Sequence, residues 1–378
     1  MAYKSKKVNS ILIILARESR GITQQELAEK LSVSQGWLSR VEGGLRGIQD
    51  TDLKKLSAVL DYPPEFFLQD DKIYGPNISE MFNRKRQNIT NKILNAVYAQ
   101  VSIRSMNIEK LLRGVNIGEV SIRQIDLGDF DGKPKEVARI VRAGWRLPKG
   151  PVQSLVDAIE NQRAIIIPFD FKTNKIDAMS HWQSGIPPLF FVNRYSPADR
   201  LRFTLCHEVG HIVMHQENID PNMENQADEF ASEFLMPESD IRPYLKDLSL
   251  EKLATLKQYW KVSMAALLKR ASDLGEITPR QARTLWTQMS KAGYRLREPV
   301  EIDLPKESPS LLGEILMTYI VDMRYTTKEL AELLCLSEKE MRDIYLDSNS
   351  HKASIENERR AAIRSAEEII KKAYKETS

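Results

Sequence analysis

The chain has 378 residues, which is too long for one ordinary hydrophobic core, so we expect two or three domains. Hydrophobic residues make up 42% and charged residues 28% of the chain, near the averages for soluble globular proteins, which excludes a disordered or fibrous chain. A formal net charge of +3 excludes a strong global field, so any binding of nucleic acid must come from a local surface.

The cysteines and the N-terminal segment predict a protein of the cytoplasm. Cys206 and Cys335 lie far apart in the sequence and do not form the disulfide framework of a small secreted domain. The apolar run at residues 11–15 is followed at once by Arg17 and Glu18, so it is too short for a signal peptide or a membrane helix. We therefore predict a buried first helix and no membrane partner.

Residues 10–67 show the pattern of short amphipathic helices. Thr23 is an N-cap residue with Glu26 three positions later, which satisfies the capping-box pattern and predicts a well-started helix. A tight turn at residues 32–34 leads to a second short helix, which Gly43 stops. Four residues near the start of this second helix point outward, where a recognition helix enters the major groove of DNA: Gln35, Gly36, Ser39 and Arg40.

These residues resemble the lambda-repressor/Cro-like helix-turn-helix family, also called the XRE family, over about residues 8–68. The motif Thr-Gln-x-x-Leu-Ala-x-x-Leu stands at residues 23–31, and Ser-x-x-x-Leu-Ser-x-x-Glu begins at Ser34. The resemblance implies double-stranded DNA as a partner, with a phosphate contact by Gln24. It also implies that four residues face bases or backbone: Gln35, Gly36, Trp37 and Arg40. A protein-docking module on the same fold is the alternative, since fold does not fix function.

Basic residues are interleaved with apolar ones at helical spacing between residues 77 and 113. This pattern predicts one or two bridging helices with a basic outer face. The face is interpreted as a solvated connector, with an additional phosphate-contacting surface as the alternative. The basic residues are Arg84, Lys85, Arg86, Lys92, Arg104, Lys110 and Arg113.

The middle of the chain mixes helical and strand patterns after a turn-rich stretch at residues 128–132. The expected elements, in chain order, are helices at 136–145 and 153–161 and strands at 164–168, 176–180 and 189–193. Long helical patterns follow from Ala198 and are broken at Pro237, Pro243, Pro279, Pro299 and Pro309.

The strongest chemical signal is the string His207-Glu208-Val209-Gly210-His211 within a well-patterned helix. Two histidines four positions apart project from one helix face, where both imidazoles reach one zinc ion. Glu208 lies between them, where a carboxylate activates a zinc-bound water. The pattern therefore predicts a zinc site with Glu208 as the catalytic base.

A catalytic zinc ion needs a third protein ligand and an open position. Glu224 and Asp228 lie four apart at the start of the next helical pattern. Glu224 is the predicted third ligand, and Asp228 is the predicted acceptor for the second nitrogen of a ligand histidine. His215 is the alternative third ligand, although a residue eight positions along a helix has turned well away from the first.

Residues of this region resemble the ImmA/IrrE family of metallopeptidases over about residues 135–245. The matching features include Arg202-Phe203-Thr204-Leu205, the His207–His211 string, His215, and Glu224-x-Gln226-Ala227-Asp228. The resemblance implies an α+β, zincin-like peptidase domain whose substrate is another protein, such as a DNA-bound repressor.

Two further features carry weaker signals. His181 is expected in a surface loop, with a substrate or oxyanion contact as the alternative. The same two interpretations apply to Tyr195. Residues 326–336 have helix-turn-helix-like spacing, which packing on the peptidase domain explains equally well. No internal repeat of fixed period is apparent.

We therefore predict a multidomain chain. Its segments are an all-α helix-turn-helix bundle at 1–70, a helical connector at 71–130, a zincin-like domain at 131–245 and a helical region at 246–378. The predicted function is a DNA-binding regulator that acts by limited zinc-dependent proteolysis of a regulatory protein. The alternatives are a transcription factor with a non-catalytic sensor or scaffold domain, and a toxin–antitoxin or phage-lysogeny component. The sequence leaves the oligomeric state open, with a homodimer as one expectation.

Overall fold

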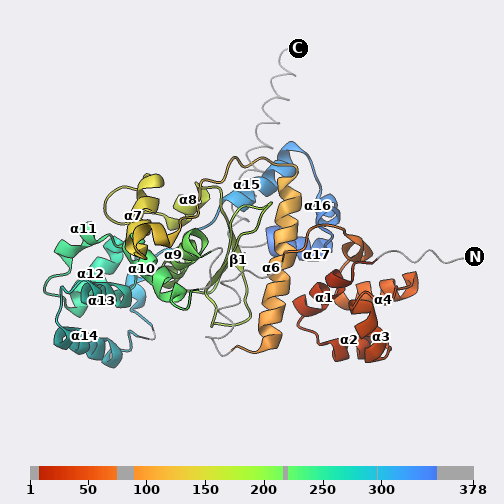
Figure 1. The fold of residues 1–378 in the computed structure, drawn as a ribbon, viewed down its shortest axis with the longest axis horizontal. Helices are drawn as coiled ribbons and strands as arrows, with labels where there is room; N and C mark the ends of the chain where they lie inside the picture. Colours follow the sequence, from red (N-terminus) through yellow and green to blue (C-terminus); the bar gives the residue numbers. More distant parts are fainter. Residues whose placement is uncertain (1–7, 75–88, 216–219, 296, 347–378) are drawn as a thin grey trace, which may run out of the picture. The chain divides into compact units, whose positions relative to one another are not determined.

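The computed structural model describes residues 8–74, 89–215, 220–295 and 297–346 (Figure 1). The chain forms two compact units. The first consists of Met1–Pro76, Asn88–Ile117 and Ser310–Ser378, and the second of Asn77–Gln87 and Gly118–Pro309. This grouping divides the C-terminal helical region of the sequence prediction between both units. The predicted boundaries at residues 70, 130 and 245 stay predictions about separately folding domains.

The first unit begins with the predicted helical bundle. The capping box is formed: Glu26 N–H donates to Thr23 Oγ1 at 3.2 Å, and Thr23 N–H donates to the Glu26 carboxylate at 2.6 Å. Pro63 and Pro64 follow the last α-helix of the bundle, and Pro64 starts a short 3-10 turn, a position that proline tolerates. The elements are α1 (Ser10–Ser19), α2 (Gln24–Leu31), α3 (Gln35–Glu42), α4 (Asp50–Leu60) and η1 (Pro64–Leu68).

The predicted bridging segment is one long helix, α6 (Asn91–Leu112), on which α1 packs. The predicted basic outer face is wrong for two of its members, since Arg104 and Lys110 are buried. Lys110 is held by Gln69 and by Asp71, because a buried ammonium needs polar partners. Arg84, Lys85 and Arg86 lie outside the described residues.

The C-terminal helices of the first unit also pack on α6. Tyr319 Oη donates to the Leu111 carbonyl at 2.8 Å, and Asn107 Nδ2 donates to Tyr345 Oη at 3.1 Å. The segment predicted at residues 326–336 therefore belongs to the unit that holds the N-terminal bundle. Its elements are α15 (Leu311–Met317), the π-helical turn η5 (Thr318–Asp322), α16 (Thr327–Leu334), α17 (Glu338–Met341) and the π-helical turn η6 (Arg342–Leu346).

The second unit is built on a three-stranded sheet with the order β1-β3-β2. β1 (Ile165–Phe169) pairs in parallel with β3 (Leu189–Asn193), and β2 (Ala178–His181) pairs antiparallel to β3 at one edge. The three strands confirm the predicted positions within two residues. β1 and β3 are almost continuously apolar because both faces of the sheet are covered.

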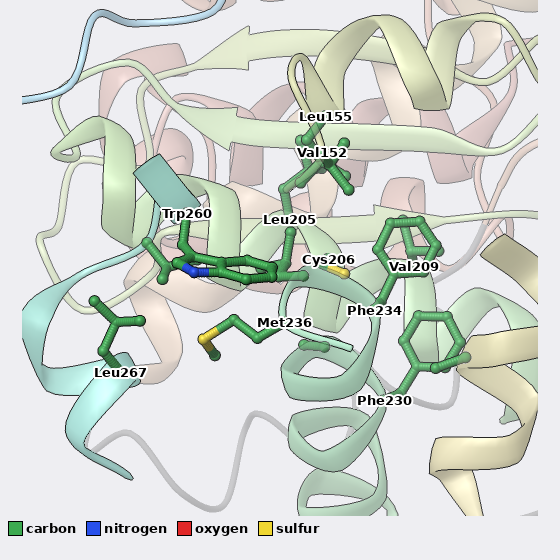
Figure 2. Packing of buried hydrophobic residues seen from close by; sticks show 14 of the residues in the cluster. Val152, Leu155, Leu205, Cys206, Val209, Phe230, Phe234, Met236, Trp260 and Leu267 are labelled. Carbon is green, nitrogen blue, oxygen red and sulfur yellow. The ribbon is translucent and has the colours of Figure 1, made fainter. Parts of the chain in front are cut away.

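Helices cover this sheet and form the core beneath the helix α9 (Ala198–Met214). Figure 2 shows Leu205, Cys206 and Val209 of α9 among Phe230 and Phe234 of the next helix, with Trp260 close by. The other elements are η2 (Leu127–Phe130), α7 (Pro134–Gly144), α8 (Leu155–Glu160), α10 (Met223–Leu235), α11 (Glu238–Ile241), η3 (Arg242–Tyr244), α12 (Leu250–Trp260), α13 (Met264–Asp273), α14 (Pro279–Lys291) and η4 (Val300–Ile302).

One expectation about this unit needs correction. His181 lies in β2 with no exposed surface, so the predicted surface loop is wrong. The strand extends one residue beyond the predicted 176–180, and α9 packs on it. The helical pattern is broken between α13 and α14 as expected, and Pro279 itself starts α14, since proline is favoured in the first turn. In the described part of the chain, no helix is long and apolar enough to span a membrane.

Candidate metal centre and nucleic-acid interface

Three predicted ligands meet on the facing sides of α9 and α10. His207 Nε2 lies 2.9 Å from His211 Nε2, while Glu224 Oε2 lies 3.7 Å from His207 Nε2 and Glu224 Oε1 lies 3.4 Å from His211 Nε2. Ligand atoms about 2 Å from one tetrahedral zinc ion lie roughly 3.3 Å apart. The three donor atoms therefore fit a single ion of this kind.

A glycine explains how Glu224 comes so near the histidines. A Cβ atom at Gly210 would lie 3.2 Å from the Phe230 ring and 3.3 Å from the Ala227 Cα. Any larger residue at this position would push α10 away from α9. The glycine inside the histidine motif thus sets the distance between the two helices that supply the ligand atoms.

The second nitrogens of both histidines are engaged. His207 Nδ1 lies 2.8 Å from Asp228 Oδ1, which accepts its proton and leaves Nε2 as a bare lone pair. This is the place predicted for Asp228. Burial lowers the pKa of His207, but this hydrogen bond and nearby carboxylates outweigh it and leave the pKa raised. A metal ion competes with a proton for Nε2.

A longer chain of hydrogen bonds fixes the other histidine. Gln226 Nε2 donates to Asp220 at 2.7 Å, so Gln226 Oε1 accepts from His215 Nε2 at 2.8 Å. His215 Nδ1 is then an acceptor for His211 Nδ1–H at 3.0 Å, and His211 Nε2 carries a lone pair. Two lone pairs 2.9 Å apart repel each other unless a cation or proton lies between them. His215 is thus placed behind His211 and not beside the donor cluster.

The electrostatics of His211 suit a ligand, since a metal binds the neutral form of imidazole. His211 is 2% exposed, and burial lowers its pKa to about 4. The imidazole is therefore neutral at neutral pH.

Glu208 lies on the side of α9 that faces the sheet edge. Its Oε2 accepts from Ser180 Oγ at 2.6 Å and from Ser180 N–H at 2.9 Å, so β2 orients the carboxylate. Burial raises the pKa of Glu208 to about 7, within the range that suits a base near neutral pH. The arrangement can hold a proton acceptor next to a three-donor metal cluster.

Sequence reasoning missed Ser180 and Gln226. Ser180 lies 28 residues before Glu208, and only the packing of α9 on β2 joins them. Gln226 was seen only as part of a family motif. Helical spacing gave no signal for it, because a residue two positions from both Glu224 and Asp228 lies on a different face of the helix. Tyr195 is largely exposed.

In the first unit, the predicted reading surface is open. Ser34 caps α3 by accepting from Trp37 N–H at 3.1 Å, and four residues of α3 are exposed as predicted: Gln35, Gly36, Ser39 and Arg40. Trp37 is half-buried beneath the Arg46 guanidinium, which lies 5.7 Å from the ring centre.

Gln24, at the start of α2, forms hydrogen bonds with residues of α3. Its amide donates to Glu42 at 2.9 Å and accepts from Gln35 at a longer 3.4 Å. Glu42 is buried and also pairs with Arg17 at 2.7 Å. These bonds hold the side chain at the start of α2 in a fixed orientation before any ligand binds.

The fold and site define a helix-turn-helix domain joined to a peptidase-like α+β domain. Comparison with protein families agrees: residues 13–67 match the family described as helix-turn-helix, and residues 160–272 match the IrrE N-terminal-like domain of the Peptidase_M78 family. The two matches agree with the domain order expected from the sequence, a helix-turn-helix domain followed by an ImmA/IrrE-type domain. The second match extends through α12 and α13, beyond the resemblance read from the sequence. No curated protein matches the chain.

Proposed function

We propose that the second unit is a zinc endopeptidase that cleaves another protein, and that the first unit binds double-stranded DNA. The peptidase proposal rests on which ring nitrogens of the two histidines on α9 carry a proton. The bonds from Asp228 and His215 turn the bare nitrogens of both histidines toward Glu224, while Glu208 lies buried alongside. This arrangement supports the ligand roles of His207, His211 and Glu224.

A zinc ion held there would polarise the scissile carbonyl and lower the pKa of a water molecule. Glu208 accepts the proton of the attacking water and returns it to the leaving amine. Ser180 holds the Glu208 carboxylate through two hydrogen bonds, so that its second oxygen is free to take the proton. Asp228 and His215 keep the ligand histidines in one tautomer.

Zinc content and cleavage test this proposal together. Purified protein should contain one zinc ion per chain and should cut a repressor-like protein encoded beside it at one or a few bonds, as mass spectrometry would show. Stoichiometric zinc without cleavage of such proteins would favour the alternative, a DNA-bound regulator whose second unit is a sensor or scaffold. A cytoplasmic location, a homodimer and a phage or toxin–antitoxin setting remain predictions.

Ser180→Ala removes one of the two hydrogen bonds that orient Glu208. We expect a drop in kcat of roughly 10- to 100-fold with little change in KM, because a charge-assisted bond of about 1.5–3 kcal/mol is lost while the backbone N–H still holds the carboxylate. Steady-state kinetics on a cleaved peptide would measure it. Ser180→Thr keeps a hydroxyl and should restore part of the rate. An equal loss in both variants would mean that only packing matters at this position.

Replacing Gln35 and Arg40 by Ala should weaken specific DNA binding by about tenfold or more, because bidentate base contacts are worth about 1–3 kcal/mol each. The variant is made in the full chain, since α1 packs on α6 and a fragment ending near residue 70 would expose that face. Fluorescence anisotropy with a selected operator measures the affinity. Gln25→Ala on the exposed face of α2 is the control. Unchanged affinity in the double variant would favour the protein-docking reading of this domain.

A further inference from the structure

The C-terminal helices of the first unit repeat the local structure of α2 and α3. Thr326 caps α16 by accepting from Glu329 N–H at 3.2 Å, and Thr326 N–H donates to the Glu329 carboxylate at 2.7 Å. This is the same capping box that Thr23 and Glu26 form at the start of α2. Both helices span eight residues.

The turns that follow the two helices also agree. α2 ends at Ser32 with φ 56° and ψ 43°, and α16 ends at Cys335 with φ 54° and ψ 45°, both left-handed. Ser34 and Ser337 then cap the next helices through their side chains. These positions keep the same spacing in both segments, so the second turn aligns with the first without a gap.

The burial pattern follows the same alignment. The apolar residues that join α2 to α3 are matched by apolar residues between α16 and α17, and all are buried: Leu27, Ala28, Leu31 and Leu38 correspond to Leu330, Ala331, Leu334 and Met341. Gly21, two residues before the N-cap of α2, has φ 63°, and Arg324, at the same place before α16, has φ 59°. The sequence analysis found no internal repeat, and these two helix pairs show that this expectation was wrong.

The exposed residues of the second pair differ in charge from those of the first. Glu338 and Asp343 take the positions of Gln35 and Arg40, and both are exposed. Carboxylates at these two places would face phosphates and repel them. The surface that reads DNA in the first copy is thus unsuited to DNA in the second.

One residue of α17 instead contacts the first copy. Glu340, which takes the position of Trp37, accepts two hydrogen bonds from Arg20 at 2.8 Å each, with its side chain 12% exposed. Arg20 also donates to the carbonyls of Leu60 and Asp61 at the end of α4, both at 2.8 Å. A single guanidinium therefore joins α1, α4 and α17.

The long helix α6 supports both copies along its length. Gln100 donates to the Ser19 carbonyl of the first copy at 3.2 Å. Nearer the end of α6, Asn107 and Leu111 bond to Tyr345 and Tyr319 of the second copy. α1 and α16 both pack on α6, and Figure 1 shows α16 and α17 next to this helix.

We propose that residues 310–346 form a second helix-turn-helix, and that it docks on the first copy of the same chain through the Arg20–Glu340 pair instead of reading DNA. The occupant of its docking face is thus the N-terminal bundle. Charge complementarity and the shared support on α6 carry this assignment. The C-terminal segment becomes a structural part of the DNA-reading unit, although it follows the peptidase-like domain in the sequence.

Hydrogen exchange on the full chain tests the docking. Glu340→Gln should raise amide exchange rates in α1 and α16 by about tenfold, since it weakens a charge-assisted pair that is mostly buried. Adding Arg20→Met should produce little further change in α16, because the two residues act through one contact. Glu332→Gln is the matched control, as Glu332 pairs only along its own helix with Lys328 in the described structure. Fully additive effects of the two changes would overturn the docking.

A DNA-binding measurement distinguishes docking from DNA binding by the second helix-turn-helix. This measurement rests on the proposed DNA binding of the first copy. With a 40-base-pair duplex as the probe, Lys339→Ala with Arg342→Ala should leave the affinity within about twofold. A loss as large as that caused by Gln35→Ala with Arg40→Ala would overturn the proposal. If neither pair of changes alters binding, the DNA function of the first copy fails, and the exchange result alone decides the docking.

Discussion

Glu208→Gln is expected to slow cleavage by orders of magnitude while leaving the zinc content and the DNA affinity unchanged. General acid–base catalysis contributes roughly 100- to 10,000-fold, so the rate constant should fall by that factor. The amide oxygen of Gln can still accept both hydrogen bonds from Ser180, so the local geometry should survive. Zinc analysis, anisotropy on operator DNA and single-turnover cleavage of the substrate measure the three properties.

In cells, the same variant distinguishes a regulator that acts by proteolysis from one whose second unit is a non-catalytic sensor. If regulation depends on proteolysis, Glu208→Gln should occupy its operator and still fail to switch its target genes. The neighbouring buried residue Cys206 offers a control, because Cys206→Ala changes α9 without touching the base. A Glu208→Gln protein that regulates normally would contradict the enzyme reading and leave a metal-stabilised sensor.

Local signals in the sequence predicted the parts of the fold that local physics determines. The capping residue Thr23 and the glycine at position 43 mark helix ends through bonds that span three or four residues, so α2 and α3 were placed correctly. The spacing of His207 and His211 needed only the helical period to bring both rings to one face.

Contacts between distant segments were not predictable in this way. Ser180 reaches Glu208 because β2 is the sheet edge that packs on α9, which depends on strand order. The tautomer of His211 depends on a chain of bonds that ends at Asp220. The burial of Arg104 and Lys110 on α6 follows from helices that pack around it from both ends of the sequence.

The site residues on α9 were easier to predict from the sequence than the one on α10. A helix that carries both proposed ligand histidines and the proposed base places these groups within five residues, so a motif suffices to find them. The third donor comes from α10, whose distance from α9 is set by Gly210. Gly210→Ala would therefore be expected to weaken metal binding without removing a ligand, because it separates the helices.

Glu224→Ala should lower the zinc content far more than His215→Ala. Glu224 offers both oxygens within 3.7 Å of the histidine nitrogens, so its loss removes a bond to the metal. His215 bonds only to the back of His211, and loss of such a supporting partner typically costs roughly 10–100-fold in affinity.

Competition with a chelator measures both dissociation constants on the purified variants. Glu224→Gln is a useful third variant, since it retains the shape and one neutral oxygen but removes the charge that balances the ion. We expect its affinity to fall between those of the Ala variants at Glu224 and His215. If His215→Ala instead loses zinc more readily than Glu224→Ala, His215 is the third ligand, and the bond from His211 Nδ1 to His215 Nδ1 must break when the metal binds.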